Sequence, residues 1–197
     1  DGKPQEIRYF ERETDLPLTL GLLVDVSASQ KTLIETERRA ADAFFANVLR
    51  AKDMAFLMSF GAEAELLQDY TGSLVLLRKG LDELKLSTPP MSPTSSPVPT
   101  VYKPRGTILF DAVYLAATEK LRSEVGRKAV VVITDGVDTG SRVKLAEAIE
   151  AAQKADIIIY SIYYVDPRAY GGSGFGYAPG NGDLRRMSEE TGGRLFE

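Results

Sequence analysis

The chain has 197 residues, of which 44 % are hydrophobic and 26 % are charged, a composition typical of an ordinary globular domain. Its formal net charge is −4, and without a basic stripe it offers no electrostatic basis for nucleic-acid binding. The absence of cysteine and histidine excludes disulfides, thiolate nucleophiles, Ser-His-Asp triads and imidazole metal sites. A bound metal must therefore take oxygen ligands, as Mg²⁺, Mn²⁺ and Ca²⁺ do. No apolar run is long enough to span a bilayer.

Apolar stretches typical of buried strands alternate with amphipathic helical stretches along most of the chain. Segment 5–13 is compatible with a short edge strand, and the continuous apolar run 18–25 predicts a strand buried on both faces. Residues 30–50 show helical spacing, with Ser29 as the expected N-cap. Further strands are predicted at 53–60, 65–71, 128–135 and 156–165, and further helices at 73–85, 107–122, 143–154 and 182–193. This order predicts an α/β fold with a doubly wound, mostly parallel central sheet flanked by helices on both faces.

Two segments interrupt the alternation. Segment 86–106 is rich in Pro, Ser and Thr, and segment 170–183 is rich in Gly with interspersed aromatic residues. Such compositions are typical of flexible surface loops, with the alternative that both border a binding face and contribute specificity. We divide the chain into an N-terminal extension or edge strand, 1–17, and one domain, 18–197. Because the chain begins without Met and ends where a strand is expected to start, we expect it to be part of a longer protein.

Acidic and hydroxyl side chains follow the ends of the predicted strands. Asp25 and Asp135 each end an apolar strand, and two buried acids on neighbouring strands repel unless a cation or a proton lies between them. Ser27 and Ser29 follow Asp25 at alternate positions, and Thr107 opens a helix where it can add a third hydroxyl. This set suits a hard dication that keeps some of its waters. The alternative without a metal is that Asp25 caps the turn and Ser29 the helix.

The same segments resemble the von Willebrand factor type A (VWA) domain family. Residues 25–29 resemble its Asp-x-Ser-x-Ser motif, 106–112 the segment that carries its threonine, and 134–136 its distal aspartate turn. Together they resemble a metal-ion-dependent adhesion site (MIDAS), and the resemblance covers residues 18–197. The sequence of residues 1–7, Phe10 and residues 138–142 is similar to that of a bacterial subgroup of the family, the VWFA-related proteins. One difference is Gln30, where many relatives have methionine, and we expect no effect of it on the metal.

The resemblance implies a Rossmann-like VWA fold and a role for each candidate residue. Ser27 and Ser29 would coordinate the ion directly, Thr107 directly or through water, and Asp25 and Asp135 mostly through water. An ion with few direct carboxylates keeps positive character and can accept an Asp or Glu carboxylate from a partner protein as its last ligand. Mg²⁺ is favoured, with Mn²⁺ and Ca²⁺ as alternatives. Resemblance to the bacterial subgroup implies an extracytoplasmic or secreted location.

We therefore expect a non-enzymatic, metal-dependent protein–protein interaction module. A scaffold that binds partners through segments 86–106 and 170–183 is the alternative. A phosphoryl-transfer enzyme with Asp25 as nucleophile is disfavoured, because Ser27 stands where such an enzyme needs a second carboxylate. The sequence also has no nucleotide-binding G-x-x-x-x-G-K-[ST] loop and no histidine to act as a general base.

Overall fold

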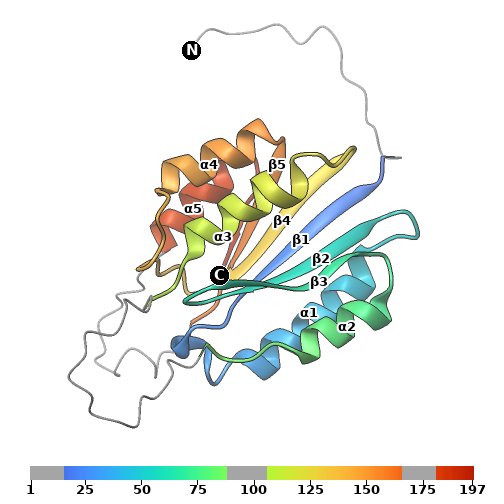
Figure 1. The fold of residues 1–197 in the computed structure, drawn as a ribbon, viewed down its shortest axis with the longest axis horizontal. Coiled ribbons are helices and arrows are strands. Elements are labelled where there is room, and N and C mark those ends of the chain that lie inside the picture. Colours follow the sequence, from blue (N-terminus) through green and yellow to red (C-terminus); the bar gives the residue numbers. More distant parts are fainter. Residues whose placement is uncertain (1–15, 88–105, 166–180) are drawn as a thin grey trace, which may run out of the picture.

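The structure is a computed structural model that describes residues 16–87, 106–165 and 181–197, in which one central sheet has helices on both faces (Figure 1). The strands are β1 (Leu18–Asp25), β2 (Met54–Phe60), β3 (Ala64–Thr71), β4 (Arg127–Thr134), β5 (Ile157–Tyr163) and β6 (Leu195–Phe196). The helices are α1 (Ile34–Val48), α2 (Leu74–Asp82), α3 (Leu109–Leu115), α4 (Leu145–Lys154) and α5 (Asn181–Glu190), with a 3₁₀ turn η1 (Ala28–Gln30) and a π-helical segment η2 (Ala116–Leu121). The possible edge strand at 5–13 and most of 86–106 and 170–183 lie outside the described residues.

The strand order is β3-β2-β1-β4-β5-β6, and only the β2–β3 pair is antiparallel. β1 therefore lies between two parallel neighbours, with Asp25 opposite Phe60 on one side and Val24 opposite Ile133 on the other. The predicted doubly wound, mostly parallel α/β sheet is confirmed. Because β1 and β4 are adjacent and parallel, Asp25, the last residue of β1, and Asp135, the first residue after β4, lie at the same edge of the sheet.

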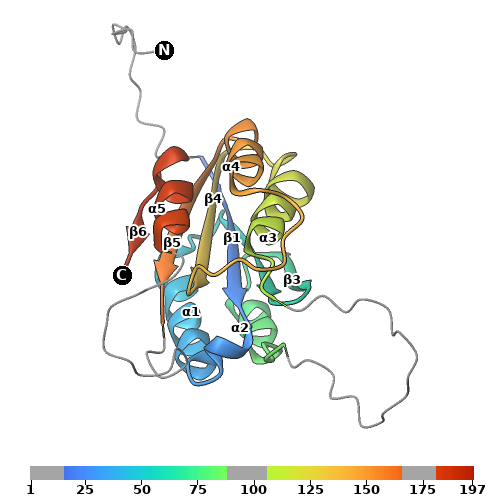
Figure 2. The same cartoon turned by 90° about the vertical axis from the view of Figure 1, so that its left-hand side faces the viewer.

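Alternate residues of β1 face two separate apolar layers, as expected for a strand buried on both faces. Leu20, Leu22 and Val24 pack with α1 and α2, whereas Leu23 packs with α3, η2, α4 and α5. Figure 2 shows the two groups of helices on opposite sides of the sheet. Within the described parts of the chain, no helix is long and apolar enough to cross a membrane.

The predicted N-cap at Ser29 is wrong. The chain forms η1 directly after Ser27 and α1 begins only at Ile34, with Leu33 at the N-cap position. The hydroxyl of Ser29 instead donates a hydrogen bond to Asp135, a residue 106 positions later in the chain. The side chain that could have capped the helix thus ties β1 to the end of β4.

The predicted helix 107–122 is shorter and less regular than expected. α3 begins at Leu109, because the carbonyl of Thr107 accepts hydrogen bonds from the backbone of Thr139 and Gly140. From Ala116 the helix continues with π-type hydrogen bonding, and there the Lys120 carbonyl accepts a hydrogen bond from the hydroxyl of Tyr70 on β3. The helix is therefore tied to its neighbours at both ends.

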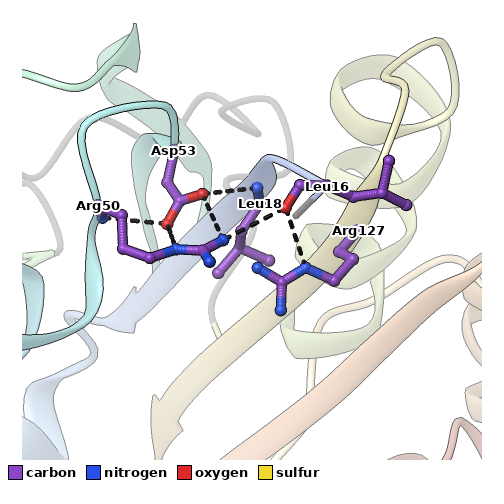
Figure 3. Close-up of polar contacts among 5 residues, drawn as sticks. All are labelled: Leu16, Leu18, Arg50, Asp53 and Arg127. Atoms are coloured by element: carbon purple, nitrogen blue, oxygen red, sulfur yellow. Dashed lines mark hydrogen bonds and ion pairs between the residues drawn. The ribbon is translucent and has the colours of Figure 1, made fainter. Parts of the chain in front are cut away.

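A buried acid, Asp53, lies where β1 begins, at the end of the sheet opposite to Asp25 (Figure 3). Asp53 is 1 % exposed, and it accepts hydrogen bonds from the backbone nitrogens of Leu18 and Arg50 and from the Arg50 guanidinium. Arg50 and Arg127 both donate to the carbonyl of Leu16. The bonds from Arg50 lower the pKa of Asp53 from 3.8 to about 2. This network fixes the start of β1, and the candidate site lies at the strand's other end.

Candidate metal centre

Asp25 is an organising residue at the end of β1, with both carboxylate oxygens engaged. Oδ1 accepts a hydrogen bond from the backbone nitrogen of Ser27 (2.8 Å), and Oδ2 accepts one from the hydroxyl of Thr134 (2.6 Å). The backbone nitrogen of Gly136 in turn donates to that hydroxyl (3.0 Å). Asp25 thus holds the turn after β1 and the end of β4 in one arrangement. These bonds favour an indirect role for its carboxylate toward an ion.

Two serine hydroxyls and the second acid meet above this carboxylate. Ser27 Oγ and Ser29 Oγ are 3.0 Å apart and share a hydrogen bond, and Ser29 Oγ donates to Asp135 Oδ2 at 2.6 Å. Asp135 is 1 % exposed, and its Oδ1 accepts a hydrogen bond from the backbone of Val137 (3.1 Å). Both serines are partly exposed. Four of the five predicted site residues, Asp25, Ser27, Ser29 and Asp135, therefore belong to one hydrogen-bonded arrangement across two neighbouring strands.

Thr107, the fifth predicted residue, is held by backbone bonds. Its backbone nitrogen donates a hydrogen bond to Thr139 Oγ1 (3.1 Å), and its carbonyl accepts hydrogen bonds from the backbone nitrogens of Thr139 and Gly140. The following nitrogen, of Ile108, donates to the carbonyl of Gly61 just past β2. Gly106, with φ of 139°, makes this approach possible, because a Cβ there would lie 2.4 Å from Thr139 Oγ1. The hydrogen bonds described above that join Asp25, Ser27, Ser29 and Asp135 do not include Thr107.

Acids just outside the cluster also have structural roles. Asp111 Oδ1 accepts hydrogen bonds from the backbone of Arg142 and Val143. Asp138 accepts from Ser141 and from the backbone of Phe110. These bonds fasten the loop after β4 to α3.

The electrostatic environment of the cluster disfavours negative charge. Burial is the largest cause that raises the pKa of Asp25 from 3.8 to about 6, against the lowering effect of its hydrogen bonds. Burial also raises the pKa of Glu37 on α1 from 4.5 to about 8, and the charges of Asp25 and Asp135 raise it further. Among the described residues, no basic side chain contributes to the pKa of Asp25 or Glu37. A cation would relieve this accumulation of buried acids.

The residues present fit a hard cation bound mainly by hydroxyl oxygens. In the described part of the chain, no three acidic side chains converge as a metal-binding group, so the potential ligands are two acids combined with hydroxyls. The same part contains only three residues with buried side-chain polar atoms that lack a partner, namely Gln30, Glu37 and Tyr163. Gln30 directly follows Ser29 in the sequence. The charge of Asp135 contributes to raising the pKa of Glu37 and the pKa of Tyr163. Unsatisfied buried polar atoms are rare in native proteins, and here each of them belongs to a residue linked to the cluster by the sequence or by the charge of Asp135.

Sequence reasoning assigned no role in this region to Thr134, Glu37 and Gln30, although Gln30 was noted as a difference and Thr134 lies in the 134–136 turn. Thr134 lies at the end of β4, directly before Asp135, where a hydroxyl next to a strand-ending acid is a usable signal. Glu37 lies on the buried stripe of α1 with Ala41 and Phe45, so an acid at helical spacing within an apolar face could have drawn attention. Nothing in the sequence marks Gln30 as fully buried.

Comparisons with known proteins place the fold. Neither a protein-family model nor a curated protein matches the sequence. Among solved structures, an aerotolerance-related membrane protein from Bacteroides fragilis matches at 17 % identity and TM-score 0.63, over 91 % of this chain and 90 % of that protein. A von Willebrand factor type A protein from Catenulispora acidiphila matches at 15 % identity and TM-score 0.62, over 91 % of this chain and 38 % of the other.

A third match is proximal thread matrix protein 1 from the mussel byssus, with a zinc-occupied MIDAS motif. It matches at 14 % identity and TM-score 0.62, over 91 % of this chain and 41 % of that protein. This chain thus spans less than half of the last two proteins. The chain has a VWA-like fold, as the sequence resemblance implies.

Proposed function

We propose that this VWA-like chain is a non-enzymatic interaction module that binds a divalent cation through Asp25, Ser27, Ser29, Thr107 and Asp135. The observation that carries the proposal is the bridge between neighbouring strand ends, in which Ser29 Oγ lies 2.6 Å from Asp135 Oδ2 and 3.0 Å from Ser27 Oγ. The hydroxyls of Ser27 and Ser29 are direct ligands, and Thr107 completes the hydroxyl set directly or through water. Asp25 and Asp135 balance the charge.

The proposed partner is a protein that supplies an Asp or Glu carboxylate as the last ligand of the ion. Because its direct protein ligands are hydroxyls and the two aspartates act mostly through water, the ion keeps positive character and has affinity for an incoming carboxylate. Mg²⁺ is the proposed ion because the set is rich in hydroxyls and keeps waters, with Mn²⁺ and Ca²⁺ as alternatives. The zinc-occupied MIDAS of the mussel protein supports divalent-cation binding by this kind of fold.

We also propose that residues 18–197 form the VWA domain, preceded by an extension at 1–17, in the bacterial VWFA-related subgroup. An extracytoplasmic location is part of the proposal, and the similarity to an aerotolerance-related membrane protein supports it.

A second candidate function, binding through segments 86–106 and 170–183, is favoured by where these segments leave the fold. At one end of the first segment, the backbone nitrogen of Ser87 donates a hydrogen bond to the carbonyl of Val26, which lies between Asp25 and Ser27. At the other end, Gly106 directly precedes Thr107 and packs against Thr139. Tyr164 donates to the carbonyl of Thr134 just before the second segment begins. Both segments therefore start beside the cluster, where they could contact a partner with or without a metal.

Calorimetric titration of the EDTA-treated protein with Mg²⁺, Mn²⁺ and Ca²⁺ tests the proposed cation site. We expect saturable binding at one site, lost in Asp135→Ala and kept in Asp82→Ala, an exposed aspartate on α2. No binding of any of the three ions would contradict a preformed site.

Peptide selection then separates the two candidate functions. A random peptide library is selected on the protein in Mg²⁺ and in EDTA. Enrichment of Asp- or Glu-containing peptides in Mg²⁺ alone supports the cation-dependent module. Equal enrichment in EDTA, and on Asp135→Ala, supports binding through segments 86–106 and 170–183.

A further inference from the structure

Glu37 is a buried acid that the proposed ligand set does not use. It is 2 % exposed, and neither carboxylate oxygen has a hydrogen-bond partner among the described residues. Burying a carboxylate without a partner is strongly unfavourable unless a proton or a cation neutralises it. The contrast with Asp53 is direct, because Asp53 is equally buried but accepts several hydrogen bonds and pairs with Arg50. Packing of α1 against the sheet does not explain an acid at position 37.

The fold places Glu37 on the helix that follows the cluster along the chain. It lies in the first turn of α1 and on the buried stripe that continues through Ala41 and Phe45. The helix follows the Ser27–Ser29 turn through only a short connection, so its first turn lies near the carboxyl end of β1 (Figure 2). The charged groups that act on Glu37 are Asp25 and Asp135, both of its own sign.

The other buried polar atoms without partners lie around the same cluster. Gln30 is completely buried directly after Ser29, with neither amide atom bonded. The hydroxyl of Tyr163, at the end of β5 opposite Thr134, is also buried and without a partner. Buried polarity is therefore unsatisfied around one cluster, and in the described residues nowhere else.

We propose that Glu37 is a third acidic residue of the cation site, which acts as a buried counter-charge to the bound ion. This inference rests on the proposed cation site and extends it. Glu37 is a positioning charge and not a ligand, because no three acids of the described chain converge closely enough to share an ion. The contribution of Glu37 to affinity is coulombic and grows with the charge of the ion.

The test compares cation affinity in Glu37→Gln, which removes the charge and keeps the shape, with that of the unchanged protein. Calorimetry with Mg²⁺ and luminescence titration with Tb³⁺ report the two ion charges. We expect Mg²⁺ binding to weaken about tenfold and Tb³⁺ binding about thirtyfold, because the coulombic free energy scales with the ion's charge. The matched control is Glu35→Gln, in the same turn of α1 but with a side chain 68 % exposed, and we expect it to stay within about twofold of the unchanged protein.

A second variant separates charge from shape. Glu37→Asp keeps the charge on a shorter side chain, and we expect it to retain most of the affinity that Glu37→Gln loses. Equal affinity of Glu37→Gln and the unchanged protein would overturn the inference and leave the proposed function standing. Equal losses in Glu37→Gln and Glu37→Asp would also overturn it, since shape and not charge would then matter. If the unchanged protein bound no ion, the proposed function and the inference would fall together.

Discussion

The stability of the cation-free protein should fall as the pH rises from 6 to 8, and Glu37 should be the cause. The pKa of Glu37 is raised from 4.5 to about 8, so between these values the folded state holds a proton that the unfolded state has released. Stability decreases with pH wherever the folded state binds more protons. At about 1.4 kcal/mol per pKa unit, the loss between pH 6 and pH 8 is about 2 kcal/mol.

The pH interval is chosen so that other groups contribute little. The raised pKa of Asp25, about 6, gives a loss of the same sign, but between pH 3.8 and 6. The raised pKa of Tyr163 lies above its usual value of 10. Urea unfolding in EDTA, followed by far-ultraviolet circular dichroism because the chain has no Trp, gives the free energy of unfolding at each pH. We expect Glu37→Gln to remove most of the fall. A flat profile for the unchanged protein, or the same fall in Glu37→Gln, would refute the reasoning.

Three further substitutions test separate parts of the structure. Gln30→Met should raise the free energy of unfolding by about 1–3 kcal/mol, because it removes a buried amide without a partner; a decrease in urea unfolding would contradict this. Asp53→Asn should lower the free energy of unfolding by about 1–3 kcal/mol at pH 7. The difference from the unchanged protein should shrink as the pH falls from 4 toward 2, where the lowered pKa of Asp53 lies. A difference that does not depend on pH would contradict the role of the Asp53 network. Gly106→Ala should cost about 1–3 kcal/mol and weaken Mg²⁺ binding, because φ of 139° strains any residue with a Cβ; Gly182→Ala, with no atom within 4 Å of the added Cβ, is the control, and equal effects of the two would contradict the reasoning.

The sheet and the meeting of its acids could be predicted from the sequence because they depend on patterns that local chemistry imposes. Continuous apolar runs gave β1 and β4, and their parallel pairing follows from the helices between strands. Once β1 and β4 are neighbours, Asp25 and Asp135 must lie at one edge. The spacing of Ser27 and Ser29 then brings their hydroxyls together, as the 3.0 Å separation shows.

Features that depend on tertiary contacts could not be predicted in the same way. The start of α1 at Ile34 depends on the bond from Ser29 to Asp135, a residue that is distant in the sequence. Glu37 interrupts an otherwise apolar stripe, and helical periodicity alone does not distinguish a buried acid from a solvated one. The late start of α3 likewise follows from the bonds of Thr107 to the loop after β4.

The central position of β1 has a consequence for hydrogen exchange. A strand paired on both sides and covered on both faces exchanges its amides only when the whole domain opens, whereas a surface turn exchanges through local fluctuations. Asp25 ends such a strand, while Ser27 and Ser29 lie on the partly exposed turn just beyond it. Bound Mg²⁺ should therefore slow exchange at the turn by a large factor and leave the amides of Leu22 and Val24 limited by global unfolding. Asp25 would then be held as rigidly as the core, whereas Ser27 and Ser29 could still adjust to each ligand.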